Sequence, residues 1–268
     1  MPLRPNELLI DDASPADVLF PKGFGRGAVP RDYATHPPGM FSPPSDIPLI
    51  PRSEWSDRVK EKEREKSQTS DVLLAAGIPS LNQASDGFCW SYSTGGCVIA
   101  SRALNNLPYL KLNPHAPASI IKGGRNEGGW CGLSLQFLRD HGIPTEEFWP
   151  GQSRDLRHDT PAMRANAALH KVTEEWCDLD KAVYDQNLAE DMIASLLLSN
   201  VPVAGDFLWW AHSVMLCDLV EVEPGSFGWR FRNSWTDSYG DRGFGVIRGS
   251  KTRTMGAVAI RTTRPSAA

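Results

Sequence analysis

The sequence lacks several features that would place it in a special class of protein. No run of 18 apolar residues is present, which excludes a typical membrane-spanning helix. The net charge is -4 and there is no basic stripe, so we expect neither a nucleic acid nor a membrane as partner. The first residues also lack the apolar core of a secretory signal peptide.

Cysteine is scarce, and its spacing excludes the common zinc patterns. The five cysteines are Cys89, Cys97, Cys131, Cys177 and Cys217. We expect no metal and no cofactor, and we expect the last four cysteines to be packing residues. An odd number of cysteines without an evident pairing favours a reducing compartment, so the sequence predicts a cytoplasmic protein.

The remaining composition is that of a globular chain with an unusual beginning. The 268 residues are 41% hydrophobic and include nine Trp, which favours one large domain with an aromatic core. Residues 1–52 hold 11 of the 21 prolines and predict an extended arm that packs on its own domain or on a neighbouring chain. Residues 53–80 predict a charged surface helix and a linker, and residues 81–268 the main domain.

The most informative stretch is Asn82–Ser93, which combines a turn signal with a cysteine. Asp86-Gly87 predicts a turn, and the small and apolar residues from Cys89 to Leu104 predict a buried helix. The sulfur of Cys89 would lie at the helix N-terminus, whose partial positive charge favours a thiolate. Gln83 precedes it by six residues, which brings an amide near the sulfur.

This stretch resembles the active-site segment of the papain-like cysteine peptidases. Gln83, Gly87, Cys89 and Trp90 match that segment in ungapped register, whereas Asp86 replaces the usual half-cystine of the loop. We expect the negative charge of Asp86 to raise the pKa of the thiol. The alternative interpretation is a buried structural cysteine.

A second motif lies far along the chain. The run from Asn233-Ser234-Trp235 to Phe244 resembles the Asn-Ser-Trp segment of the same family. His212 opens a predicted strand between the two motifs. His212 and Asn233 follow Cys89 by 123 and 144 residues. In a papain-type site both lie about 130–150 residues downstream, so the order matches, Asn233 fits and His212 comes slightly early.

The resemblance implies a role for each of these residues. Cys89 would be the nucleophile, His212 its base, and Asn233 the group that orients the imidazole. Gln83 and the backbone N–H of Cys89 would stabilise the oxyanion. The reaction would be peptide hydrolysis through an acyl-enzyme.

The family also suggests residues around this centre. Trp90 and Trp235 would support the active site. The expected substrate-binding residues are Gly128, Gly129, Trp130 and Trp210. Two paired glycines allow a substrate strand to approach the backbone closely.

The periodicity of the chain predicts helices first and strands afterwards, which is the α+β, two-lobed papain-like fold. The loop is expected at 105–132, an irregular segment at 144–187, and helices at 89–104, 133–139, 161–169 and 188–199. The strands are expected at 201–207, 213–222, 228–232, 243–248 and 255–261.

Three functions remain open at this point. The first is a cysteine endopeptidase. In this case residues 1–80 could form a segment that blocks the cleft. The second is a latent or structural assembly component, for example of a virus particle, tethered by its N-terminal arm. The third is another Cys–His acyl-transfer enzyme, which the Asn-Ser-Trp segment argues against.

Overall fold

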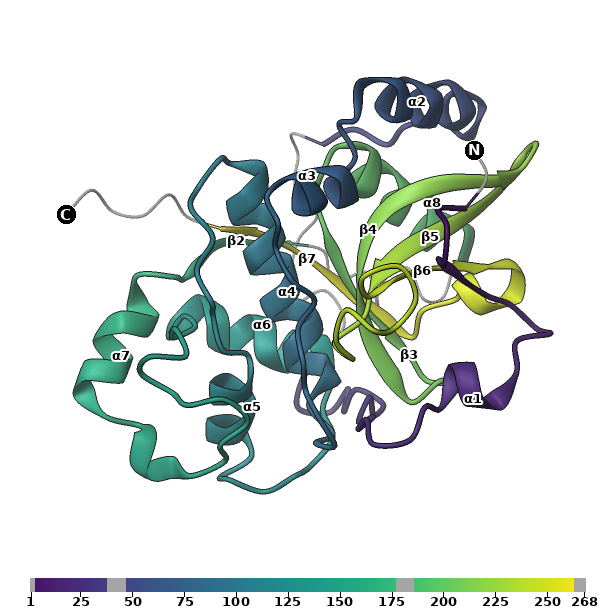
Figure 1. Cartoon of the computed structure of the whole chain (residues 1–268). Coiled ribbons are helices and arrows are strands. Elements are labelled where there is room, and N and C mark those ends of the chain that lie inside the picture. Colours follow the sequence, from purple (N-terminus) through teal and green to yellow (C-terminus); the bar gives the residue numbers. More distant parts are fainter. Residues whose placement is uncertain (1–2, 38–46, 177–185, 263–268) are drawn as a thin grey trace.

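The computed structural model describes residues 3–37, 47–176 and 186–262, and these form a helical lobe packed against a sheet lobe (Figure 1). In the helical lobe, α4 packs against α5 and α6. The α-helices are α1 (Ala16–Leu19), α2 (Arg52–Glu65), α3 (Thr69–Ala75), α4 (Cys89–Leu104), α5 (His115–Ile121), α6 (Cys131–Asp140), α7 (Pro161–Ala168) and α8 (Gln186–Leu198).

The sheet has seven strands in the order β1-β6-β5-β4-β3-β7-β2. All neighbours are antiparallel except β1, which runs parallel to β6. The strands are β1 (Leu8–Ile10), β2 (Val172–Trp176), β3 (Val203–Phe207), β4 (His212–Glu223), β5 (Ser226–Arg232), β6 (Phe244–Arg248) and β7 (Gly256–Thr262). The predicted α+β, two-lobed architecture is confirmed.

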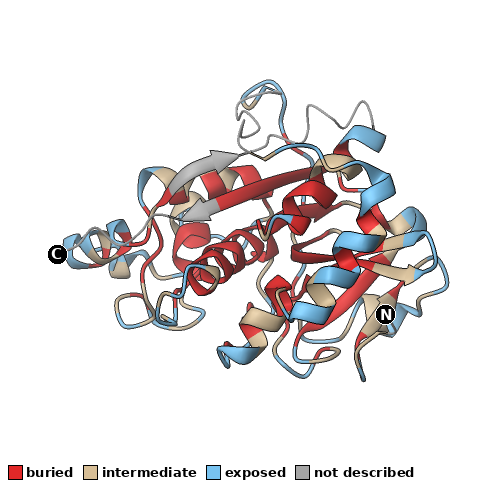
Figure 2. Cartoon of the chain, turned by 90° about the horizontal axis from the view of Figure 1, so that it is seen from above, coloured by how far each residue is buried: buried red, intermediate tan, exposed pale blue. Residues whose placement is uncertain are grey.

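Helix α4 is the centre of the molecule, and its buried residues run without a break from Cys89 to Ala103 (Figure 2). Its small and apolar composition is what allows other elements to surround it. A Cβ on Gly95 would lie 2.5 Å from a side-chain carbon of Pro114. The mid-helix glycine costs about 1 kcal/mol relative to alanine, and it permits this close contact.

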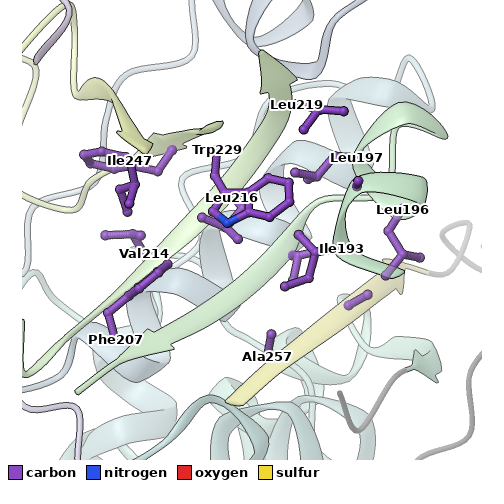
Figure 3. Packing of buried hydrophobic residues seen from close by; sticks show 14 of the residues in the cluster. Ile193, Leu196, Leu197, Phe207, Val214, Leu216, Leu219, Trp229, Ile247 and Ala257 are labelled. Carbon is purple, nitrogen blue, oxygen red and sulfur yellow. The ribbon is translucent and has the colours of Figure 1, made fainter. Parts of the chain in front are cut away.

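The core of the sheet lobe forms between α8 and the inner strands (Figure 3). Apolar side chains of α8 lie against large side chains of the sheet; the labelled residues include Ile193, Leu196, Leu197, Phe207, Leu216, Leu219 and Trp229. Helix α2 is charged, as predicted, but it buries Trp55 and Val59 against the same core. Among the described residues, no helix is both long and apolar enough to span a bilayer.

Three predictions about local structure are wrong. The expected loop 105–132 contains α5, and the expected irregular segment 144–187 contains β2. The arm is not only extended, because it contributes β1 and α1. These elements have seven residues or fewer, and β1 and β2 are edge strands held by partners far along the sequence, so local periodicity carries little signal for them.

The described part of the arm packs on its own domain. β1 extends the sheet edge, and Glu7 just before it pairs with Arg230 of β5, with Nε of Arg230 2.6 Å from Oε1 of Glu7. Further on, the indole N–H of Trp210 donates to the carbonyl of Leu19 at 2.6 Å. The arm is therefore an integral part of the folded unit.

Candidate active site

Cys89 is the first residue of α4, as predicted, and its side chain is fully buried. The preceding residue, Phe88, gives the helix no side-chain cap, and its carbonyl accepts from the N–H groups of Ser91 and Tyr92. The sulfur accepts a hydrogen bond from the backbone N–H of Gly27 at 3.3 Å and is also within hydrogen-bonding reach of Ser213.

His212 and Asn233 are brought together by the pairing of β4 with β5. His212 begins β4, Asn233 directly follows the end of β5, and the two strands are antiparallel neighbours. The Nε2 atom of His212 lies 2.8 Å from Oδ1 of Asn233. An amide oxygen only accepts hydrogen bonds, so Nε2 carries the ring proton and Nδ1 is left as an acceptor. Nδ1 is buried and has no hydrogen-bond partner among the described residues.

Two tryptophans enclose this imidazole. Trp235 stacks on His212 with ring centroids 4.3 Å apart and an angle of 24°, and Trp210 meets it edge-on at 4.9 Å. Both indoles are fully buried. They exclude water from the His212–Asn233 hydrogen bond. Trp210 thus lies against the imidazole, and its predicted contact with substrate stays a prediction.

Gln83 directs its amide group into the cleft. Its Oε1 accepts a hydrogen bond from the hydroxyl of Ser234, which fixes the NH2 group on the other side. That group donates to the carbonyls of Gly25 at 3.0 Å and Asp86 at 2.8 Å. The sequence predicted that this NH2 group donates to the oxyanion. In the structure it donates instead to carbonyl oxygens of the chain itself.

The cleft is filled by a segment of the N-terminal arm, residues 24–29, which we call the strap. The carbonyl of Gly27 accepts from the N–H of Gly129 at 2.9 Å, and the N–H of Val29 donates to the carbonyl of Gly129 at 3.0 Å. The N–H of Ala28 donates to the carbonyl of Ala211 at 3.1 Å. Figure 1 shows this N-terminal chain crossing from α1 toward the lower end of α4.

These bonds show that the two walls of the cleft face each other across the strap. Gly27 contacts Cys89 on one wall, and Ala28 contacts the residue before His212 on the other. Around Ala28 the strap runs parallel to the chain at Gly129. The sulfur faces an amide N–H rather than a carbonyl carbon, so the strap occupies the cleft without presenting a bond for attack.

Burial controls the protonation of the pair in this closed arrangement. It raises the pKa of the Cys89 thiol to about 11, although hydrogen bonds from Ser213 and Gly27 act in the opposite direction. It lowers the pKa of His212 to about 3, against the effect of the hydrogen bond to Asn233. In this closed arrangement burial therefore favours the neutral thiol and the neutral imidazole. Burial in the closed state opposes the thiolate–imidazolium pair, because the enclosed site excludes the water that would stabilise both charges, and that pair stays a prediction.

The predicted influence of Asp86 on the sulfur is also wrong. Its carboxylate turns to the helical lobe, where it pairs with His115 at 3.0 Å and Arg154 at 3.2 Å. The carboxylate whose charge raises the pKa of Cys89 is Asp206 in β3. Sequence reasoning missed it, and the only available signal was an acidic residue inside an otherwise buried strand.

The remaining predicted site residues lie along the strap. A Cβ on Gly128 would come within 2.6 Å of the carbonyl oxygen of Gly27, so this wall is in direct backbone contact with the strap. Trp130 is covered by the guanidinium of Arg31, 4.6 Å from the ring centroid. Trp90 donates its indole N–H to the carbonyl of Gly87 at 3.1 Å and so supports the loop before Cys89.

Of the other cysteines, Cys97 and Cys217 are free and buried in the core between the lobes, as expected. Cys131 is also free and buried at the start of α6, but its thiol donates a hydrogen bond to Asp206 at 3.1 Å. Cys177 lies outside the described residues. In the described part of the chain, no cluster of three His, Cys, Asp or Glu could hold a metal ion.

Sequence comparison finds cysteine proteinases as relatives. Digestive cysteine proteinase 2 of Homarus americanus is 22% identical over 213 residues, covering 69% of this chain and 62% of the relative. Cathepsin K of Mus musculus is also 22% identical, over 196 residues, covering 66% of this chain and 58% of the relative. The chain thus spans about three fifths of the length of these two proteins. No established family profile matches it.

Solved structures agree with this relationship. Xylellain, a cysteine protease from Xylella fastidiosa, superposes with a TM-score of 0.59 at 16% identity, covering 91% of this chain and 98% of xylellain. The chain therefore has the papain-like fold. A second papain-like neighbour is the proform of the ragweed pollen cysteine protease Amb a 11, with a TM-score of 0.58 at 14% identity and coverage of 91% and 77%.

Proposed function

We propose that this papain-like protein is a cysteine endopeptidase that is latent in the arrangement described above. One observation carries the proposal: Asn233 holds Nε2 of His212 at 2.8 Å, Cys89 begins α4 within hydrogen-bonding reach of Ser213, the neighbour of His212 in β4, and the strap fills the cleft. Cys89, His212 and Asn233 are the groups that acyl transfer requires. The strap keeps a substrate out of the cleft.

The chemistry follows once the strap leaves and a polypeptide takes its place. Nδ1 of His212 accepts the proton of the Cys89 thiol, and the thiolate attacks the carbonyl carbon of the substrate. Gln83 donates to the developing oxyanion, a contribution of about 2.7–4 kcal/mol for one donor in a comparable site. The imidazolium returns its proton to the leaving amine. Water, activated by the same imidazole, then hydrolyses the thioester.

Several lines of support favour latency over the other functions considered. The relatives and structural neighbours are cysteine proteinases, and one neighbour is described as a proform. The comparisons do not favour a structural assembly component. Gly128, Gly129 and Trp130 lie along the strap and would contact a substrate that replaces it. The cytoplasmic location stays a prediction.

The proposal is tested by labelling with an epoxysuccinyl thiol-protease inhibitor, followed by peptide mapping, and by hydrolysis of unfolded casein. We expect slow labelling of the intact chain, only at Cys89, and none in Cys89→Ala. We expect His212→Ala to remain folded but to hydrolyse casein at least about a hundredfold more slowly, since general-base catalysis contributes 10²–10⁴-fold.

The matched control is His158→Ala, because that histidine lies in the helical lobe away from the cleft. It should leave labelling and hydrolysis unchanged. Absence of labelling at Cys89 in both the intact chain and a variant with a displaced strap would reject the peptidase function.

A further inference from the structure

A buried polar cluster lies directly behind the nucleophile, and the reaction outlined above does not use it. Its centre is Asp206, which is 3% exposed. Oδ1 of Asp206 accepts hydrogen bonds from the hydroxyl of Ser213, at 2.5 Å, and from the thiol of Cys131, at 3.1 Å. Its Oδ2 accepts from the backbone N–H of Cys131 at 3.0 Å. The cluster therefore links β3 and β4 of one lobe to the first turn of α6 in the other.

The strand pairing explains why Asp206 and Ser213 meet. They are directly opposite each other in the antiparallel pair of β3 and β4, one position from the pair of Phe207 and His212. The strand that delivers the imidazole thus also delivers the Ser213 hydroxyl. Because both residues are on regular strands, their mutual geometry is fixed.

Ser213 connects this carboxylate to the nucleophile. Its backbone N–H and its hydroxyl both reach the sulfur of Cys89. A hydroxyl has one proton to donate. When that proton is directed to Asp206, the Ser213 oxygen can only accept from the thiol, so the neutral S–H form of Cys89 is stabilised. A thiolate would need the same proton, in competition with the carboxylate.

We propose that Asp206 is a positioning residue that acts through Ser213 to set the pH at which Cys89 becomes a reactive thiolate. The inference rests on the proposed function, because it gives this cluster a role in the peptidase site. Asp206 opposes ionisation by its charge and by holding the Ser213 hydroxyl. Ser213 favours ionisation whenever its hydroxyl turns to the sulfur.

Other charged or titratable groups also face this site, and they must be the same in all of the variants that are compared. His212 lies on β4, Cys131 on α6, and Arg26 of the strap acts on His212. The measurement is therefore made in a common Gly27→Ala background, in which we expect the strap to be displaced. The rate of alkylation of Cys89 by iodoacetamide is followed against pH, with peptide mapping to separate it from other thiols.

Two substitutions should move the profile in opposite directions. Asp206→Asn removes the charge and keeps an acceptor for the N–H of Cys131, so we expect the midpoint to fall by about one pH unit. Ser213→Ala keeps the charge and removes the hydroxyl donor, so we expect the midpoint to rise. Ser213→Thr restores a hydroxyl and should return the midpoint toward that of the background.

A purely structural role gives a different result. If Asp206 only ties the lobes together, both substitutions lower the melting temperature and leave the midpoint unchanged, and this outcome overturns the inference. A shift of both midpoints in the same direction also overturns it. If Asp206→Asn does not fold, the pH midpoints of Ser213→Ala and Ser213→Thr still test the inference. Alkylation reports the thiol and casein hydrolysis reports the reaction, so loss of hydrolysis in the background protein would reject the peptidase function while leaving the ionisation result readable.

Discussion

Replacement of Gly27 by alanine is expected to open the cleft and to accelerate labelling of Cys89. A Cβ at this position would lie 2.0 Å from the carbonyl oxygen and 2.8 Å from the Cα of Gly87. Both atoms belong to the backbone of the loop that precedes the nucleophile, so a rotamer change cannot relieve the clash. Overpacking of this kind costs about 1–3 kcal/mol, which corresponds to a shift of about 5–150-fold toward the open state.

Labelling with the epoxysuccinyl inhibitor should become faster by that factor, and casein hydrolysis should rise with it. Water entering the cleft would also relieve the burial that raises the pKa of Cys89 and lowers the pKa of His212. The pH at which the thiol reacts should therefore move downward relative to the intact chain. The control is Lys22→Ala, because this side chain is exposed just before the strap and should leave the rate unchanged. Equal labelling rates for Gly27→Ala and the intact chain would show that the strap does not limit access.

The strap is held at both ends, which determines how it can open. It lies between β1 and α2 in the chain, and both elements pack on the sheet lobe. Removing residues 1–80, which the sequence suggested as a way to unblock the site, would also remove a strand of the sheet and the buried Glu7. A substitution within the strap is therefore a cleaner test than a truncation. We therefore expect release to be a local displacement of residues 24–29.

The sequence predicted those parts of the site that depend on local pattern. Helix 89–104 was predicted with its observed bounds because a run of mostly small or apolar residues follows a clear turn signal. The meeting of His212 and Asn233 followed from two motifs whose strands are neighbours. Prediction of these features needs only the pattern of one helix or strand and the residues at its ends.

The parts that sequence could not supply depend on contacts between distant segments. β1 is three residues long and pairs with β6 across most of the chain. The burial that keeps Cys89 neutral comes in part from a strap 62 residues upstream of it. Asp206 acts on the sulfur only because β3 and β4 place it opposite Ser213. No periodicity or spacing within one segment encodes these relations.

Replacement of Arg230 by methionine is expected to cause the largest loss of stability. The guanidinium lies between two carboxylates, with Nε 2.6 Å from Oε1 of Glu7 and NH1 3.5 Å from Oδ2 of Asp218. It also donates to Oε1 of Gln68 at 3.0 Å. The side chains of Arg230, Glu7 and Asp218 are 3%, 0% and 3% exposed. Methionine fills a similar volume but leaves two buried carboxylates without their shared cation.

Breaking a buried pair in this way costs about 3–5 kcal/mol, which should lower the melting temperature by about 10 °C for a chain of this size. The matched control is Arg248→Met. That guanidinium also joins the arm to the sheet, through Asp11 at 3.0 Å, but it is 29% exposed, so we expect a loss of at most about 1 kcal/mol in the free energy of unfolding. Urea unfolding followed by tryptophan fluorescence measures the free energy of unfolding of both variants.

Adding Glu7→Gln to Arg230→Met should recover part of the lost stability by removing one of the two unpaired charges. Equal destabilisation by the two arginine variants, or no recovery in the double variant, would contradict the assignment of Arg230 as the buried anchor of the arm.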